Sequence, residues 1–269
     1  MCSNVWGYFQ RSMKAIDLSF VEKVMNIYFS LLLFCCIVPG SVRSENLHST
    51  YDALLQEQVT DTGMVDYQAL VDSPLQLKTY LEQLKSITRE DYEEWVPERQ
   101  LAFLLNLYNA ATLQLIVDHY PVESIKDIGG WLSGPWDQKV VPFLGSTVTL
   151  NHLEHEIIRK EFAETPETHF ALVCAAMGCP PLRREAYTAK ELIEQLQDQK
   201  STFLSNPEKN RKNADQERLY LSPIFKWYAK DFEQVSGSVQ NYISTFWPEV
   251  DETWNIRYTP YDWSLNENE

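Results

Sequence analysis

The stretch that decides the fold is ERQLAFLLNLYNAATLQLIVDHY, residues 98–120. It is apolar on almost every face of a helix, it follows an acidic start led by Pro97, and Pro121 ends it. A helix that is apolar all round must be buried on all sides. We therefore expect this segment to lie at the centre of a hydrophobic core.

Two asparagines, Asn106 and Asn109, interrupt this apolar helix and lie on one side of it, with Tyr108 between them. A buried amide without a partner costs about 1–3 kcal/mol, so each asparagine must find hydrogen bonds. Two interpretations are open at this point. The amides bond to the backbone of a nearby loop, or one of them orients a catalytic histidine.

The rest of the chain predicts a mixture of helices with a few short strands. Residues 46–94 have the apolar spacing of short amphipathic helices, and QKVVPFLGSTVTL, residues 138–150, is typical of a hairpin that turns at Gly145 and Ser146. We further expect a buried strand over 169–175, a helix over 188–204, a strand over 219–222, helices over 223–232 and 238–247, and an extended last segment. These elements predict an α+β fold, a mostly helical single domain over residues 45–269 around a small, at least partly antiparallel sheet.

The N-terminal part has the pattern of an export signal. Residues 25–44, MNIYFSLLLFCCIVPGSVRS, combine a short apolar run with a zone of small residues, and they suit cleavage before Glu45. We expect residues 1–44 to be a signal peptide and the protein to be exported, either periplasmic or secreted. The alternative is an uncleaved N-terminal anchor.

The overall charge disfavours anionic partners. The chain has 269 residues, 44% of them hydrophobic, and its formal net charge is −15. Excess acid repels nucleic acid and anionic lipid headgroups. We expect a small-molecule or peptide substrate, no nucleic acid, and no membrane contact beyond a possible N-terminal anchor.

The segment HFALVCAAMGCPPL, residues 169–182, places Cys179 on a turn. If Cys179 caps a helix that begins at Pro180, the peptide dipoles together with Arg183 and Arg184 favour the thiolate and make the sulfur reactive. The alternative is a disulfide with Cys174, which requires the two Cα atoms to come within about 7 Å.

A reactive thiol needs a base, and His155 is the best-placed histidine in the sequence. Asn151 is a good helix N-cap with Glu154 three residues later, which would put His155 on the apolar, inward face of that helix. His169 lies at the far end of the expected strand from Cys179. The alternatives are a satisfied core histidine, or a metal site built from Glu154, His155, His169 and a cysteine. We expect no metal and no cofactor.

Several collinear motifs make the chain recognisable: AFLLNLYNAATLQLIVDHYPVESIKDI, LNHLEHEIIRKEF, HFALVCAAMGCPPLRREAY, LSPIFKWYAKDF and YDWSL. Together they resemble the domain-of-unknown-function family numbered 547, with a core match over about residues 95–205. The resemblance implies that these residues occupy motif positions of the family: Asn106, Tyr108, Asn109, Glu154, His155, His169, Cys179, Pro181 and Leu182. Leu104 stands where an aromatic residue is common, and Ala176 stands where serine is common. The family's name implies no activity.

Our first functional hypothesis is a thiol-dependent hydrolase or acyl-transferase. Cys179 would be the nucleophile, His155 the base, and Asn106 or Asn109 the residue that orients the imidazole. Four further residues are candidates for substrate binding: Glu154, His169, Arg183 and Tyr108. The alternatives are a non-catalytic exported structural or binding module with structural cysteines, and a metal-dependent enzyme. The aromatic residues between positions 225 and 263 could form a glycan surface, although their helical spacing favours core packing.

Overall fold

Helix α6 (Pro97–Val117) is the central element, as its sequence predicted. The computed structural model describes residues 47–130 and 133–268, so the predicted signal peptide lies outside the described residues. Within this part of the chain, α6 is the one helix long and apolar enough to cross a membrane, but 83% of the relevant window is buried inside the protein. We assign α6 as a core helix of the folded domain.

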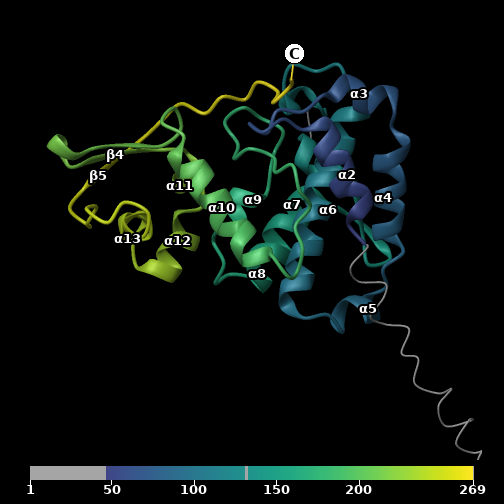
Figure 1. The fold of residues 1–269 in the computed structure, drawn as a ribbon, viewed down its shortest axis with the longest axis horizontal. Coiled ribbons are helices and arrows are strands. Elements are labelled where there is room, and N and C mark those ends of the chain that lie inside the picture. Colours follow the sequence, from purple (N-terminus) through teal and green to yellow (C-terminus); the bar gives the residue numbers. More distant parts are fainter. Residues whose placement is uncertain (1–46, 131–132, 269) are drawn as a thin grey trace, which may run out of the picture. The chain divides into compact units, whose positions relative to one another are not determined.

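Short helices precede α6 in the sequence. They are α2 (Ser49–Gln58), α3 (Tyr67–Asp72), α4 (Leu75–Lys85) and α5 (Arg89–Glu93). Helices α3 and α4 pack against α6, and α2 packs against α3 and α4 (Figure 1). Their buried faces are the leucines and tyrosines that the amphipathic spacing marked, such as Leu54, Tyr80 and Leu84. The predicted helical lead-in is therefore confirmed.

The predicted hairpin forms from β1 (Lys139–Phe143) and β2 (Ser146–Thr149), which pair antiparallel. Its turn is at Leu144 and Gly145, one residue earlier than expected, and both adopt positive φ. The hairpin leads into α7 (Leu150–His152), the π-helix η3 (Leu153–Ile158) and α8 (Arg159–Glu161). The expected capping by Asn151 is wrong, because Thr149 Oγ1 accepts the hydrogen bond from the His152 amide instead.

The strand expected over residues 169–175 is also wrong. Residues Thr168–Ala171 form the short helix α9, and the chain then continues as an extended loop. The apolar run does not become a strand because the loop backbone bonds to a side chain: Asn109 binds both the Ala171 carbonyl and the Val173 amide.

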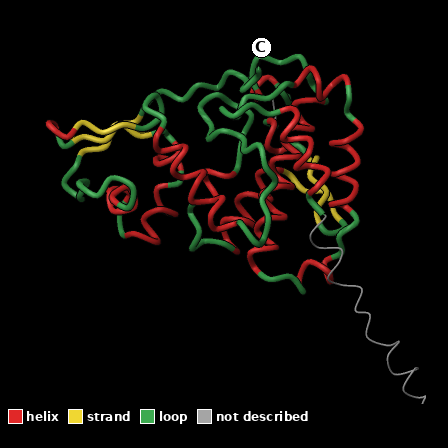
Figure 2. Tube along the Cα trace, in the orientation of Figure 1, coloured by secondary structure: helices red, strands yellow, loops and turns green. Residues whose placement is uncertain are grey.

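The C-terminal part contains the second sheet, which lies apart from the hairpin (Figure 2). In the order β3-β4-β5, β3 (Arg211–Asn213) pairs antiparallel with β4 (Arg218–Leu221), and β4 pairs parallel with β5 (Asn255–Tyr258). The helices here are α10 (Leu192–Ser205), α11 (Ile224–Trp227), α12 (Ala229–Ser236) and α13 (Val239–Ser244). Short 3-10 turns are η1 (Ile125–Asp127), η2 (Pro135–Asp137) and η4 (Ala214–Gln216). The fold is α+β, as predicted, with two small sheets in place of one.

Two hydrophobic clusters form the interior of the described residues. The first surrounds α6 and is mostly aliphatic, and the second is richer in aromatic rings and includes Leu219 and Leu221 of the three-stranded sheet. After β5 the chain returns to the first cluster (Figure 1), where residues 262–266 pair with residues 175–178. This return places the C-terminal segment beside both cysteines.

Candidate functional site

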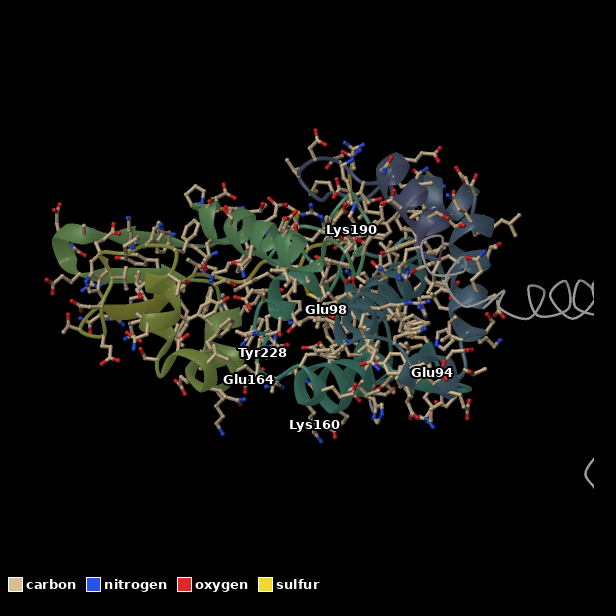
Figure 3. The ribbon with its side chains drawn as sticks, turned by 60° about the horizontal axis from the view of Figure 1, so that its bottom comes forward. Glu94, Glu98, Lys160, Glu164, Lys190 and Tyr228 are labelled. Atoms are coloured by element: carbon tan, nitrogen blue, oxygen red, sulfur yellow. A yellow bond between two sulfur atoms is a disulfide. The ribbon has the colours of Figure 1, made fainter. Side chains whose placement is uncertain are left out.

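A cavity of about 290 Å³ contains most of the residues that the sequence singled out. One wall of the cavity comes from α6 and the π-helix η3. The other wall comes from α11, from Tyr228, which follows α11 directly (Figure 3), and from the C-terminal segment. The lining residues are Tyr108, Trp136, Asn151, Glu154, His155, His169, Leu172, Cys174, Cys179, Pro180, Ile224, Trp227, Tyr228, Tyr261 and Trp263. The cavity is therefore walled mainly by aromatic rings, with a few polar groups among them.

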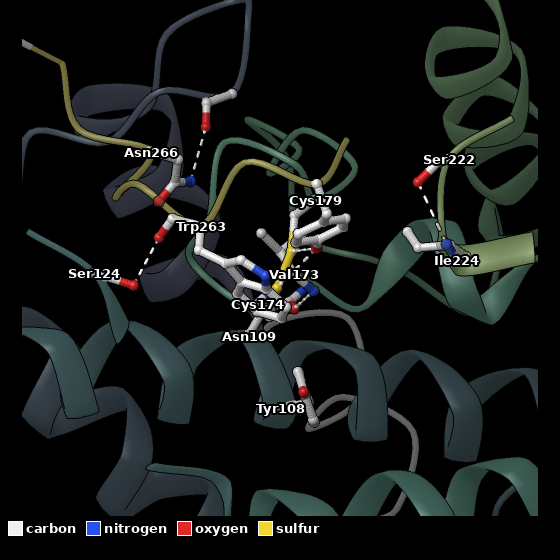
Figure 4. The surroundings of a disulfide bond; sticks show 12 residues. Tyr108, Asn109, Ser124, Val173, Cys174, Cys179, Ser222, Ile224, Trp263 and Asn266 are labelled. Carbon is white, nitrogen blue, oxygen red and sulfur yellow. Dashed lines mark hydrogen bonds between the residues drawn. A yellow bond between two sulfur atoms is a disulfide. The ribbon is translucent and has the colours of Figure 1, made fainter. Parts of the chain in front are cut away.

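The two cysteines form a disulfide on the wall of this cavity, above α6 and beside Trp263 (Figure 4). The Cα atoms of Cys174 and Cys179 are 6.2 Å apart, within the usual range for a disulfide. The Tyr261 hydroxyl donates to Cys179 Sγ at 3.2 Å and lies 3.3 Å from Cys174 Sγ. The prediction of a free thiol at Cys179 is wrong for this structure, and the alternative of a disulfide is confirmed.

The predicted electrostatic activation of Cys179 is also wrong. No helix begins at Pro180, because residues 180–183 are an extended loop. Arg183 pairs with Asp198 and Glu185, and Arg184 pairs with Asp61. Arg183 does not line the cavity, so its predicted role in substrate binding finds no support in the geometry.

Asn106 and Asn109 anchor loops and do not contact a histidine. Asn106 Nδ2 donates to the Tyr187 carbonyl at 2.8 Å, and its Oδ1 accepts from the Tyr187 amide at 2.9 Å. Asn109 also uses both ends of its amide: Nδ2 donates to the Ala171 carbonyl and Oδ1 accepts from the Val173 amide, both at 2.9 Å. The structural interpretation of both amides is confirmed, because both ends of each amide are bonded to backbone. The catalytic role of Asn106 and Asn109 stays a prediction, and this geometry gives it no support.

Glu154 is a buried carboxylate held by two phenols. Its Oε2 accepts from the Tyr108 hydroxyl at 3.0 Å, and its Oε1 accepts from the Tyr228 hydroxyl at 2.6 Å. Burial first, and then the negative charge of Glu154, raises the pKa of Tyr108 and Tyr228. Both phenols therefore remain protonated donors, and Glu154 and Tyr108 both line the cavity as predicted contact residues.

His155 lies on the rim and does not point into a sealed core. Its side chain is 37% exposed, and its Nδ1 lies 3.0 Å from Arg159 Nη1 and 3.8 Å from Glu154 Oε1. Since a guanidinium only donates, Nδ1 is the acceptor, and the neutral ring carries its proton on Nε2. Within residues 47–130 and 133–268, no hydrogen bond joins His155 to either sulfur, so its role as a base stays a prediction.

His169 is buried and belongs to a charged triad with Asp231 and Arg159. His169 Nε2 lies 2.8 Å from Asp231 Oδ2, and its ring stacks on Tyr228 with centroids 3.9 Å apart. Arg159 donates from Nε and Nη2 to the two oxygens of Asp231. Burial alone would raise the pKa of Asp231, but the hydrogen bonds from His169 and Arg159 outweigh it and hold that pKa well below its usual range.

The metal site considered from the sequence is not assembled. Among the residues that the structure describes, no group of three or more His, Cys, Asp or Glu side chains is placed to hold a metal ion. His169 is bound to Asp231, and both cysteines are in the disulfide. Glu154 receives phenol hydroxyls in place of a metal.

Sequence reasoning missed the second wall of the cavity. Trp227, Tyr228, Tyr261 and Trp263 line it, although their spacing had suggested core packing. The core interpretation is confirmed for the neighbouring Phe225, Phe232 and Tyr242, which are buried in the second cluster. Asp231 was also missed. The motifs LSPIFKWYAKDF and YDWSL, residues 221–232 and 261–265, contain all five of these missed residues and could have identified them.

Comparison with known proteins gives one match. Residues 92–204 match the family described as "Protein of unknown function, DUF547", and this range is nearly that expected from the motifs. No curated protein and no solved structure matches the chain. The match covers α6, the π-helix and the disulfide loop, whereas the second wall of the cavity lies beyond it. Over residues 92–204, the chain resembles this family of unknown function.

Proposed function

We propose that this protein is a non-catalytic binding module whose ligand is a small molecule held in the cavity between the two hydrophobic clusters. One observation carries the proposal: a cavity of about 290 Å³ has walls of aromatic rings and a single buried carboxylate, Glu154. Ligand sites in proteins are typically concave, mostly apolar, and supplied with a few well-placed polar groups.

The walls of this cavity are held in place by contacts that do not involve a ligand. On one side the disulfide and the pairing of residues 175–178 with 262–266 fix the cysteine loop. On the other side Asp231 of α12 bonds to Arg159 of α8 and to His169 of α9, and these bonds hold the three helices together. A preformed site loses less conformational entropy when the ligand binds.

The test uses a cavity residue whose loss should not affect folding. Trp227 lines the cavity and is 48% exposed, whereas Trp247 is partly buried in the second cluster and does not line it. Ligand-observed NMR with 2-phenylethanol and with indole should show binding to the wild type. We expect Trp227→Ala to weaken that binding at least fivefold and the control Trp247→Ala to leave it unchanged. Equal binding to both variants, or no binding to the wild type, would refute the proposal.

A second candidate function is the thiol-dependent hydrolase or acyl-transferase. The observation that favours it is that both sulfurs and His155 line the same cavity. An added dithiol would first reduce the disulfide to two thiols and itself become oxidised to a disulfide. The Cys179 thiolate would then attack an acyl carbonyl, expel the alcohol or amine of the substrate and form a thioester, and water or an acceptor would cleave the thioester and release the thiol. The test is hydrolysis of p-nitrophenyl acetate with and without reductant. Activity that appears on reduction and disappears in Cys179→Ala, but not in Cys174→Ala, would support this candidate, and no gain on reduction would eliminate it.

Export from the cytoplasm is part of the proposal. The apolar run and small-residue zone before Glu45 support it, and so does the Cys174–Cys179 disulfide, because disulfides persist mainly in oxidising compartments. Mass spectrometry of the protein purified from its exported fraction should give an N-terminus near Glu45. An intact N-terminal segment there would favour the anchored alternative.

A further inference from the structure

We propose that the ligand of this cavity is a small organic ammonium ion with an apolar body, bound through Glu154 and the surrounding aromatic faces. This inference rests on the proposed binding function and specifies its ligand. It follows from the charges that line the cavity, the free acceptor sites of Glu154, and the chemistry of the walls.

The charge at the cavity wall is negative. Glu154 is the one carboxylate among the lining residues that the structure describes, and no lysine or arginine is among them. The nearest guanidinium, that of Arg159, makes a two-oxygen pair with Asp231. Among the described residues no lysine or arginine forms a salt bridge with Glu154, and the Arg159 guanidinium is paired with Asp231.

Glu154 also has acceptor capacity left for a ligand. An ionised carboxylate offers about four lone-pair sites, and the hydroxyls of Tyr108 and Tyr228 fill one on each oxygen. The closest ring nitrogen, His155 Nδ1, is 3.8 Å from Oε1 and is itself an acceptor from Arg159. An ammonium group could therefore donate to the remaining sites. Charge-assisted hydrogen bonds of this kind are roughly twice as strong as neutral ones.

The walls suit a cation with an apolar body. Trp136, Trp227, Trp263, Tyr228 and Tyr261 all contribute rings to the lining. The faces of such rings attract cations, best of all for tryptophan. Two cation–π contacts of this kind already involve rings of the cavity wall. Lys126 Nζ lies 3.5 Å from the Trp263 ring centroid, and Arg159 Cζ lies 5.1 Å from the Tyr228 ring centroid. Aromatic rings around a buried carboxylate form a site that favours positive over negative ligands.

The experiment compares three probes that share one aromatic body and differ in charge: 2-phenylethylammonium, 2-phenylethanol and 3-phenylpropanoate. Affinities for the full-length protein are measured by ligand-observed NMR or calorimetry at pH 7 and low salt. We expect the ammonium probe to bind about tenfold more tightly than the alcohol, which corresponds to one charge-assisted hydrogen bond. The carboxylate probe should bind most weakly.

Two variants locate the effect. Glu154→Gln keeps the shape and the acceptor for one phenol, so it should reduce the affinity for the ammonium probe about tenfold and change that for the alcohol less than twofold. Glu156→Gln is the matched control, because Glu156 is two residues away, is exposed and pairs with Lys160. This control should leave all three affinities unchanged.

The outcomes separate the two proposals. If the alcohol binds through Trp227 but the ammonium probe binds no more tightly, the ligand class is wrong and the binding function stands. If none of the probes binds, both proposals fail. If Glu154→Gln does not fold, the order of the three probes on the wild type still decides the ligand class.

Discussion

The two hydrophobic clusters solve the problem of buried polar groups in different ways. In the first cluster, around α6, the buried amides of Asn106 and Asn109 form all of these hydrogen bonds with the backbone of loops. Where the second cluster meets the first, the polar groups of Tyr228 and Tyr261 bond to Glu154 and to the disulfide and face a cavity. The comparison teaches that Asn106 and Asn109 are structural because both ends of each amide meet backbone, whereas the two phenols meet other side chains at the wall of the cavity that we propose as a ligand site.

The largest effect should come from the amides of the first cluster. Asn109→Ala leaves the Ala171 carbonyl and the Val173 amide buried without partners, so we expect a loss of about 2–4 kcal/mol in the free energy of unfolding. Urea denaturation followed by circular dichroism measures it. Gln68→Ala is the control, because Gln68 makes only an exposed bond to Asp72. A loss below 1 kcal/mol for Asn109→Ala would contradict the anchoring role.

The disulfide should contribute the next largest amount. The double substitution Cys174→Ser with Cys179→Ser removes a cross-link over a short loop, for which the chain-entropy estimate is roughly 2 kcal/mol. The melting temperature of the double variant should equal that of the wild type measured in a strong reductant. If reductant leaves the wild-type melting temperature unchanged, the disulfide is not formed in solution.

Asp231 should have a smaller effect that depends on pH. Asp231→Asn removes the partner of Arg159 and His169, and because the side chain is 21% exposed we expect a loss of about 1–2 kcal/mol at pH 7. The pKa of Asp231 is depressed in the folded state, so its contribution is fully present above about pH 4, the unfolded value, and is lost as the pH falls. The difference between wild type and variant should therefore shrink in denaturation series run from pH 5 towards pH 2. A constant difference across that range would argue against the ion pair.

The smallest expected effect is a change in the pH dependence of the reactivity of Lys209, whose side chain contacts the cysteine loop. Its Nζ donates to the Cys179 carbonyl, and burial lowers its pKa to about 8. Acylation of Lys209 by acetic anhydride, followed by peptide mass spectrometry, should reach half its maximal rate near pH 8. A rate that still rises steeply above pH 9.5 would show that the amine is more solvated than the structure indicates.

Much of the fold could be predicted because it depends on local patterns. The periodicity of α6 and of the N-terminal helices follows from apolar spacing, and the hairpin follows from alternation around Gly145. The strand expected at 169–175 failed because an apolar run does not show what its backbone will bond to. Here the partner was Asn109, which is distant in sequence.

The candidate site could be predicted only in part for the same reason. Glu154, His155, His169 and Cys179 do share one cavity, as their motifs suggested. The roles assigned to them depended on distances between segments that periodicity cannot supply. The disulfide, in particular, depends on a bend between residues 174 and 179 that local spacing allowed but did not require.

The return of the C-terminal segment has a consequence for the time at which this domain can form during synthesis. The Tyr67 hydroxyl donates to Asn266, 199 residues later, and Asn266 donates to the Gly63 carbonyl across 203 residues. Contacts of such long range form slowly, and they cannot form before the ribosome has released residue 266. The cysteine loop beside this segment thus remains uncovered while the nascent chain emerges, and both thiols are then open to an oxidant.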